Sequence, residues 1–216
     1  MKKALITGAS RGIGRAIAEE LGRDHHIYAG ASKDASDVVA ALPSAEPFEV
    51  DLTDTDAILE AASKIEELDV LVLAAGVLHK GPFEELTDEQ WRESMAVNLL
   101  APVALTRAVL PALRRSSGLI IAINSGAGFH GVADNTAYCA SKFALRGFTD
   151  ALQEEEAGRI RVTSLHPGRT DTDMLAGDDG RPKMDAAEVA KAARLAVDAG
   201  PDAVVEFLRV RPARTS

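Results

Sequence analysis

The sequence predicts an α/β fold in which a doubly wound parallel sheet of about seven strands carries helices on both faces. Apolar runs of strand length alternate with segments of helical periodicity along the 216 residues, a pattern typical of β-α-β units. Several runs are apolar at every position, as strands buried on both faces must be. The expected strands are Ala4–Ile6, His25–Gly30, Phe48–Val50, Leu68–Gly76, Gly118–Ser125, Arg161–His166 and Ala203–Val210.

The first strand leads through a glycine-rich turn into a helix. Gly8, Gly12 and Gly14 follow the strand with the spacing G-x-x-x-G-x-G, and apolar residues then recur at every fourth position from 13 to 21. Glycines allow both a tight turn and the close approach of a ligand to the backbone. The free N–H groups and the dipole at the helix start suit a phosphate anion. The pattern favours a phosphate-binding loop, and the alternative is that it forms only a turn.

Five further segments show helical periodicity, and one polar segment does not. The expected helices are Ser36–Leu42, Asp56–Glu67, Glu89–Leu113, Tyr138–Glu154 and Asp185–Ala199. The polar residues 175–184 carry two glycines and a proline, and we predict a flap over the site there. Without an internal repeat or a low-complexity linker, residues 1–216 are expected to form a single domain.

Composition restricts the partners that the chain can have. The difference between 24 Lys+Arg and 33 Asp+Glu gives a formal net charge of −9, which disfavours nucleic acid and anionic membrane surfaces. We expect neither a membrane span of about 20 apolar residues nor a signal peptide, and therefore a cytoplasmic protein. Cys139 is the only cysteine, so we expect a packing role for it and neither a disulfide nor a metal site.

The end of the second strand bears on the choice of nucleotide. In a dinucleotide site this strand end faces the adenosine ribose, where an acidic residue selects a free 2′-hydroxyl and a basic residue accepts a 2′-phosphate. Ser32 and Lys33 come first here, and Asp34 follows them. With Arg11 in the glycine turn as a second cation, the order favours NADP(H) over NAD(H). The alternative is that these are solvated loop charges.

Residues able to carry acid–base chemistry follow the later strands. Ser125 ends the fifth strand, at the sheet edge where open α/β sheets bind ligands. Tyr138 and Lys142 are four residues apart on one helix face, so we expect the ammonium to pull the pKa of the phenol down from about 10. Asn98 lies in an apolar segment and must find hydrogen bonds. His166 precedes Pro-Gly and is predicted to be a packed, hydrogen-bonded residue at a strand end.

These motifs together resemble the short-chain dehydrogenase/reductase family. The resemblance rests on TGASRGIG at residues 7–14, Asn98, Ser125, the Tyr138-x-x-x-Lys142 pair and PGRTDTDM at residues 167–174, in this order along the chain. It implies a Rossmann-like fold and an oxidoreductase that transfers a hydride between NADP(H) and a carbonyl or secondary alcohol. It also implies self-association as a homodimer or homotetramer.

The resemblance assigns roles residue by residue. Tyr138 would be the general acid for carbonyl reduction, Ser125 would hold the substrate oxygen, Lys142 would bind the nicotinamide ribose, and Asn98 would hold a water in the proton relay. The residues expected to bind the cofactor are Gly8, Ser10, Arg11, Gly12, Ile13, Gly14, Ser32, Lys33, Asp51, Leu52, Ala75, Gly76, Tyr138, Lys142, Pro167, Gly168, Thr170 and Thr172.

One position departs from the family pattern. Where the fourth strand of the family usually ends in Asn-Ala-Gly, this chain has Ala74-Ala75-Gly76, and it therefore lacks an amide that in relatives supports the central strand and the cofactor pocket. Two alternatives to a reductase stay open. One is a non-catalytic regulator that binds NAD(P)(H) on the same fold. The other is an epimerase or dehydratase, which usually needs an additional substrate domain.

Overall fold

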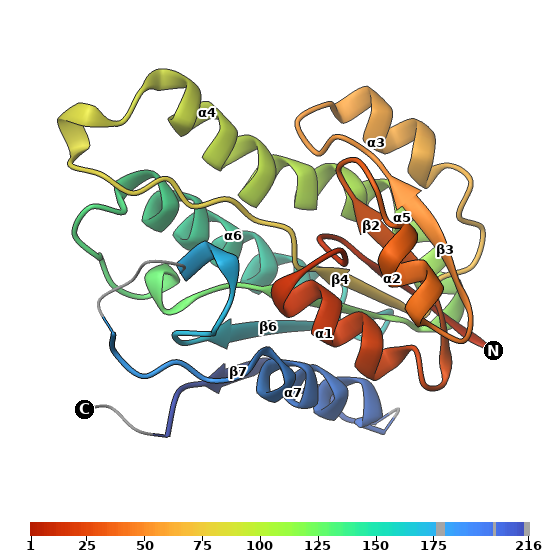
Figure 1. Cartoon of the computed structure of the whole chain (residues 1–216). Helices are drawn as coiled ribbons and strands as arrows, with labels where there is room; N and C mark the ends of the chain where they lie inside the picture. The colour runs from red at the N-terminus through yellow and green to blue at the C-terminus, as the bar shows by residue number, and fades with distance from the viewer. Residues whose placement is uncertain (176–179, 201, 214–216) are drawn as a thin grey trace.

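The computed structural model describes residues 1–175, 180–200 and 202–213, and these residues form a seven-stranded parallel sheet between two layers of helices (Figure 1). The strands pair in the order β3-β2-β1-β4-β5-β6-β7, and every pairing is parallel. The strands are β1 Lys2–Ile6, β2 His25–Ala31, β3 Ala45–Glu49, β4 Val70–Leu73, β5 Leu119–Ile123, β6 Arg161–Pro167 and β7 Phe207–Val210. The predicted fold class is confirmed.

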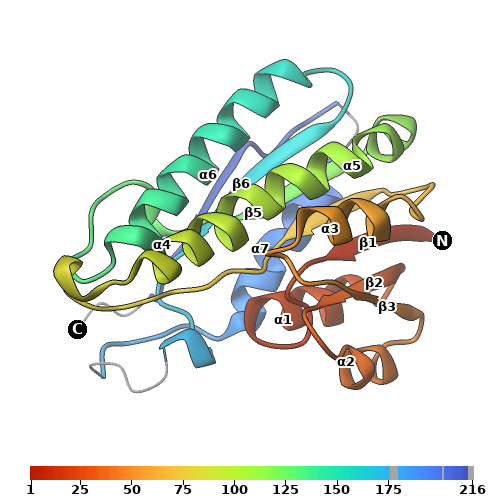
Figure 2. The ribbon, with the colours of Figure 1, turned by 90° about the horizontal axis from the view of Figure 1, so that it is seen from above.

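Helices cover both faces of the sheet, as Figure 2 shows from above. The α-helices are α1 Gly12–Leu21, α2 Ser36–Ala41, α3 Thr55–Ala62, α4 Asp88–Met95, α5 Ala101–Ser116, α6 Thr136–Glu155 and α7 Ala186–Asp198. The apolar residues of α1, α2 and α7 share one core cluster with one face of the sheet, and those of α3 and α5 share a second cluster with the other face. The buried strands β4 and β5 contribute to both clusters, which explains why their sequences are apolar throughout.

The long helical run between β4 and β5 is continuous. A π-helical turn, Ala96–Leu100, joins α4 to α5, so that Asp88–Ser116 forms one run of 29 residues. By length and composition it is the one helix among the described residues that could cross a membrane, although 56% of its most apolar window is buried inside the protein. The expectation that no apolar segment approaches that length was therefore wrong, because the apolar residues that face the core raise the hydropathy of this run.

Several boundaries differ from the sequence predictions. β3 begins at Ala45 and contains Pro47, whereas the predicted strand began at Phe48. A proline is tolerated because β3 lies at the edge of the sheet. β4 ends at Leu73, α3 ends at Ala62, and β7 begins only at Phe207. Each of these three elements is shorter than predicted.

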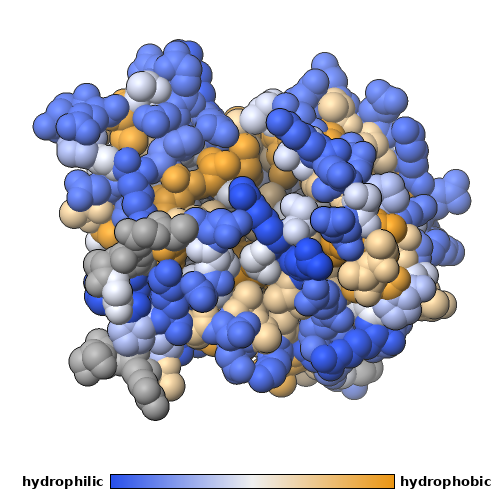
Figure 3. Space-filling model, in the orientation of Figure 1, coloured by the Kyte–Doolittle hydropathy of each residue, from blue (hydrophilic) through white to orange (hydrophobic). Residues whose placement is uncertain are grey.

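All strands end at the same edge of the sheet, and this edge positions the site. The loop after β1, the loop after β4, the short 3-10 helix Gly126–Gly128 after β5, and the Pro167-Gly168 turn at the end of β6 all lie there. A second 3-10 helix, Asp173–Leu175, follows that turn. On the face of the molecule seen in Figure 3, apolar side chains gather in the middle and hydrophilic ones surround them.

Candidate functional site

The glycine turn between β1 and α1 has the geometry that the spacing predicted. Gly8 and Gly12 adopt positive φ values of 67° and 56°, a region that favours glycine. A Cβ on Gly14 would overlap the backbone oxygen of Gly8. The N-terminus of α1 has no side-chain cap, and its first turn contains no acidic residue. The turn therefore offers uncapped N–H groups and a positive dipole end to an anion.

Thr7 ties this turn to the central strand. Its Oγ1 accepts hydrogen bonds from the N–H groups of Ala74 at 3.0 Å and Ala75 at 3.1 Å, and it donates to the oxygen of Val72 at 3.4 Å. Gly8 lies so close to Ala75 that a Cβ on the glycine would come within 2.9 Å of Cα of Ala75. The end of β4 is thus fixed by a threonine hydroxyl, although the family asparagine is absent.

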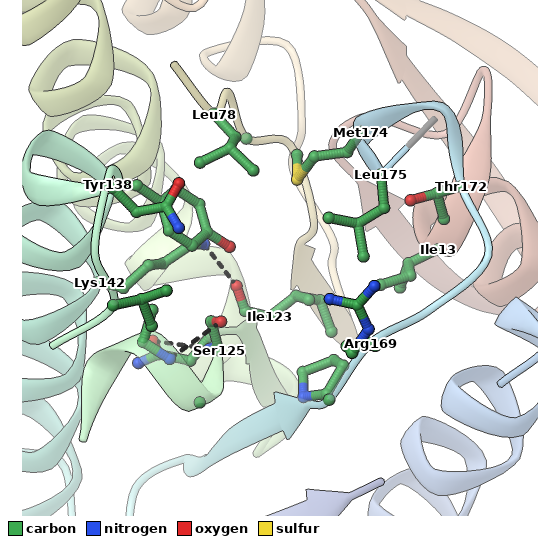
Figure 4. A pocket seen from close by; sticks show the side chains of 18 of the residues that line it. Ile13, Leu78, Ile123, Ser125, Tyr138, Lys142, Arg169, Thr172, Met174 and Leu175 are labelled. Atoms are coloured by element: carbon green, nitrogen blue, oxygen red, sulfur yellow. Dashed lines mark hydrogen bonds between the residues drawn. The ribbon is translucent and has the colours of Figure 1, made fainter. Parts of the chain in front are cut away.

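Lys142 carries its ammonium into the interior at the end of β5. Only 4% of Lys142 is exposed, and its Nζ donates to the oxygen of Ile123 at 2.9 Å (Figure 4). The nitrogen lies 5.7 Å from the centroid of the Tyr138 ring. Burial lowers the pKa of Lys142 to about 8. The group is therefore mostly charged at neutral pH and titrates just above it.

The phenol of Tyr138 faces Ser125. Burial raises the pKa of Tyr138, and a hydrogen bond with the Ser125 side chain opposes part of that rise. The expectation that the ammonium of Lys142 lowers this pKa below 10 was wrong for this structure. The physical reason is that Lys142 lies over the ring and bonds to Ile123, so removal of the phenol from water dominates. The phenol is therefore protonated at neutral pH, as a general acid must be.

Three hydrogen bonds hold Ser125 and its loop. The N–H of Ser125 donates to Oδ1 of Asn124 at 3.0 Å, and its Oγ accepts from the N–H of Ala127 at 3.2 Å. Its backbone oxygen lies 3.0 Å from Nδ1 of His166, whose Nε2 lies 2.8 Å from the hydroxyl of Ser164. His166 is fully buried, which confirms the prediction of a packed, hydrogen-bonded residue at the strand end.

Asn98 lies in the π-helical turn and anchors the loop after β4. It is fully buried; its Oδ1 accepts from the N–H of Val77 at 2.9 Å, and its Nδ2 donates to the oxygen of Val77 and to Oγ of Ser141, both at 3.0 Å. A Cβ on Gly76 would come within 3.2 Å of that Oδ1 and 3.9 Å of Nζ of Lys142. π-turns of this kind are frequent at functional sites, and this one places the amide beside Lys142.

A cavity of about 690 Å³ opens where these groups meet, a size typical of ligand sites. In Figure 4, Tyr138, Lys142 and Ser125 lie on one side of it, while Ile13, Thr172 and Leu175 lie on the other. The predicted residues that line it are Ile13, Gly76, Ser125, Tyr138, Lys142, Pro167, Gly168 and Thr172.

The other predicted residues lie outside the cavity wall. Most of them extend along the same sheet edge toward β1, β2 and β3: Gly8, Ser10, Arg11, Gly12, Gly14, Ser32, Lys33, Asp51, Leu52 and Ala75. Arg11 lies 3.5 Å from Asp173 in an exposed ion pair. Asp51 accepts from the N–H and the hydroxyl of Thr53, both at 2.8 Å. Thr170 is buried and donates to the oxygen of Gly168 at 3.1 Å.

The cavity also has lining residues that the sequence analysis did not single out. Arg169 belongs to the Pro-Gly motif, and its guanidinium reaches into the cavity (Figure 4). Arg209 and Arg211 come from the end of β7 and the residues after it. The sequence could have indicated Arg169 through its place in the Pro-Gly motif. It could have indicated Arg209 and Arg211 because they lie at the carboxyl end of the last predicted strand, and that end was expected at this edge of the sheet.

The residues present fit a dinucleotide. Its pyrophosphate needs an uncapped helix N-terminus reached over glycines, and α1 provides one. Ile13 and Thr172 flank the path from this turn to the cavity, since a Cβ on Gly12 would come within 3.3 Å of Cγ2 of Thr172. A nicotinamide in the cavity would lie beside Tyr138 and Lys142.

Comparison with known proteins supports this fit. Residues 2–181 match the family model of the short chain dehydrogenases. The chain belongs to the short-chain dehydrogenase family.

Relatives of this family match almost the whole chain. An uncharacterized oxidoreductase of Staphylococcus saprophyticus is 35% identical, with 98% of this chain and 97% of the relative covered. The 3-oxoacyl-(acyl-carrier-protein) reductase of Escherichia coli is 36% identical over 80% of this chain and 75% of its own. An alcohol dehydrogenase from Thermococcus sibiricus, solved with 5-hydroxy-NADP, has a TM-score of 0.89 at 29% identity and covers 99% of this chain and 97% of that one.

Membership in the short-chain dehydrogenase family makes the protein an NAD(P)-dependent oxidoreductase.

The predicted flap, residues 175–184, is described only in part, since 176–179 lie outside the described residues. Its described end is attached to the segment after β6. Met184 donates to the oxygen of Arg169 at 3.0 Å and accepts from the N–H of Asp171 at 2.8 Å. This pairing holds the segment that carries Thr172 over the cavity.

Proposed function

We propose that the protein is an NADP(H)-dependent reductase of a carbonyl compound, or in reverse a dehydrogenase of a secondary alcohol. The observation that carries this proposal is the meeting of Tyr138, Ser125 and Lys142 at one cavity. When bound, the cofactor supplies the hydride. We place this reaction in one cytoplasmic domain. Unlike the epimerases and dehydratases considered above, such a reductase needs no additional substrate domain.

Each side chain has a role that its surroundings support. Tyr138 is held protonated by burial and donates its proton to the substrate oxygen. Ser125, whose backbone is fixed by His166, donates a hydrogen bond to the same oxygen and stabilises the charge that develops there. Lys142 would donate to the ribose hydroxyls of a bound cofactor, and Asn98 would hold a water that returns a proton toward Tyr138.

The remaining predicted residues bind the cofactor. The N–H groups of the glycine turn would hold the pyrophosphate, and Asp51 and Leu52 would lie by the adenine. The Pro167-Gly168 turn and Thr172, which line the cavity, would hold the nicotinamide carboxamide. Thr170 contributes through the shape of the turn, because its hydroxyl is engaged by Gly168.

The preference for NADP(H) rests on charge at the end of β2. Ser32 and Lys33 are exposed there, where a 2′-phosphate would lie, and Arg11 is a second cation near the path of the cofactor. Among the structural neighbours, the alcohol dehydrogenase of Thermococcus sibiricus was solved with 5-hydroxy-NADP, and a short chain dehydrogenase of Burkholderia cenocepacia was solved with NADP. Lys33→Asp should raise the KM for NADPH about ten-fold and leave that for NADH within two-fold. Equal changes for both cofactors would contradict the assignment.

Self-association through the long helices is part of the proposal. Leu100, on the α4–α5 run, is 56% exposed, and Phe143, on α6, is 45% exposed. Apolar side chains of this size in contact with water are typical of interfaces. A homodimer or homotetramer would cover them, and sedimentation analysis measures its mass directly.

Steady-state oxidation of NADPH across a panel of ketones and aldehydes tests the activity. We expect turnover of at least some of them. Binding of NADPH without its consumption by any of the panel would favour the alternative, a regulator on the same fold.

A further inference from the structure

The cavity has a charge opposite to that of the whole chain. The chain has a formal net charge of −9, yet the described residues that line the cavity include, besides Lys142, five further cations and one carboxylate. These are Lys80, Arg169, Arg181, Arg209, Arg211 and, as the carboxylate, Asp134. A cationic cleft in an acidic protein raises the local concentration of anions. The phosphates of a bound cofactor would account only for those cations that they can contact.

The order of strands separates the cations into two groups. The phosphates of a bound cofactor would lie at the turn after β1, whereas Arg209 and Arg211 lie at the end of β7, four strands away in the sheet. At about 4.8 Å between neighbouring strands, the separation is roughly 19 Å. Ser125 follows β5, between the two positions. The two arginines are therefore on the side of the catalytic serine that points away from the phosphate turn.

Contacts fix both arginines at the cavity edge near Ser125. The N–H of Gly168 donates to the oxygen of Val210 at 2.6 Å, and a Cβ on Gly168 would come within 3.3 Å of Cα of Arg211. The chain after β7 thus lies against the turn that ends β6. Cζ of Arg209 is 6.0 Å from the centroid of the Phe129 ring, and that ring packs on His166 at 4.4 Å.

The charges of these two arginines are not neutralised by the described part of the chain. Neither guanidinium forms an ion pair with a described carboxylate, and both residues are exposed. The loop that carries Asp134, the carboxylate residue of the cavity, is attached instead to the loop after β4, because the N–H of Gly81 donates to the backbone oxygen of Asp134 at 2.9 Å. Two neighbouring guanidinium groups present the donors that carboxylates and phosphates bind.

We propose that the substrate of this reductase carries an anionic group, a carboxylate or a phosphate ester, several bonds from its carbonyl, and that Arg209 and Arg211 bind that group. The proposal rests on the proposed function for the identity of the reaction, but the anion site itself is a property of the cavity. Two strand spacings, roughly 10 Å, separate Ser125 from β7. Allowing for the length of an arginine side chain, this distance fits a carbonyl four to six carbons from the anion.

Three carbonyl probes that differ only in the distal group test this directly: 5-oxohexanoate, its methyl ester and 5-oxohexyl phosphate. With NADPH, we expect kcat/KM for the better of the two anions to exceed that for the ester at least ten-fold, mainly through KM. Whichever of 5-oxohexanoate and 5-oxohexyl phosphate has the higher kcat/KM shows whether the site prefers a carboxylate or a phosphate ester. The preference should fall as NaCl is raised from 20 to 300 mM, because the site is open to solvent.

The double variant Arg209→Gln/Arg211→Gln should reduce the preference for the anion over the ester to about two-fold or less. Arg23→Gln is the matched control, since it removes an exposed positive charge far from the cavity, and it should keep the wild-type ratio. Thermal unfolding verifies that each variant is folded. An unchanged ratio in the folded double variant, or a wild-type ratio near one, would overturn the proposal while the reductase activity stands.

A binding measurement covers the case in which no probe is reduced. Calorimetry with hexanoate and hexanol on the NADP-loaded protein should give binding of hexanoate that the double variant loses at least ten-fold. Failure of turnover with retained hexanoate binding would refute the proposed reaction and leave the anion site intact. Equal binding of hexanoate and hexanol would refute the anion site itself.

Discussion

Burial of the Lys142 ammonium lowers the free energy of unfolding at neutral pH. Its pKa is lowered from 10.5 to about 8 by burial, and at 1.36 kcal/mol per unit this corresponds to a penalty of roughly 3 kcal/mol at neutral pH. Lys142→Met removes the charge, but it also removes the hydrogen bond to Ile123, worth about 1 kcal/mol. We expect the variant to be inactive and about 1 to 3 kcal/mol more stable in urea unfolding at pH 7.

The same argument predicts the pH dependence of that difference. Between pH 8 and 10.5 the unfolded chain keeps the proton on Lys142 while the folded chain has lost it, so the free energy of unfolding of the wild type rises with pH in this window. The advantage of Lys142→Met should therefore shrink as pH increases from 8 to 10.5. A difference that stays constant from pH 7 to 10.5 would show that the ammonium is not desolvated.

His166 positions Ser125 through its tautomer. Burial lowers the pKa of His166, so the ring is neutral at pH 7. The oxygen of Ser125 can only accept, so Nδ1 carries the hydrogen and Nε2 accepts from Ser164. His166→Phe keeps the aromatic packing and removes both bonds. We expect kcat to fall about ten-fold, with the KM for NADPH unchanged, and stability to fall by about 1 to 3 kcal/mol.

His166→Gln provides the control for this position, because an amide can both donate and accept. It should recover part of the lost kcat in the same steady-state assay. Wild-type kcat in His166→Phe would mean that the Ser125 loop is held without this side chain.

At the scale of the elements, Thr7 links the end of β1 to the end of β4. Two N–H groups, those of Ala74 and Ala75, depend on its hydroxyl. Thr7→Val leaves both without this partner and should lower the free energy of unfolding by about 1 to 3 kcal/mol. Thr7→Ser keeps the oxygen and should stay within about 1 kcal/mol of the wild type. Denaturant unfolding of the two variants distinguishes loss of the bonds from loss of the methyl group.

The elements were predictable where the apolar pattern alone decides them. The buried strands β4 and β5 were evident from their composition, and the strand-turn-helix at residues 4–21 from its glycines. The start of β3 was missed, because a proline at a sheet edge costs no hydrogen bond. The π-helical turn at Ala96–Leu100 has no sequence signal of its own. It depends on the contacts of the surrounding helices, which a single sequence does not display.

At the scale of the whole molecule, the parallel β-α-β topology brings most of the site residues together. Because all strands end at one edge, residues as distant as Ile13, Ser125 and Tyr138 were expected to meet, and they line one cavity. The direction of the Tyr138 pKa could not be predicted, because it depends on how deeply the ring is buried and on where Nζ of Lys142 points. The positive charge of the cavity could not be predicted either, since its cations come from loops whose packing the sequence does not determine.

The central claim is that Tyr138 donates the proton to the substrate, and Tyr138→Phe tests it most directly. The substitution removes one oxygen, so NADPH should still raise the melting temperature of the variant as it does for the wild type, by a few degrees at saturating concentration. Turnover of a carbonyl that the wild type reduces should fall at least a thousand-fold in the same preparation. Wild-type turnover in Tyr138→Phe, with NADPH binding intact, would contradict the account.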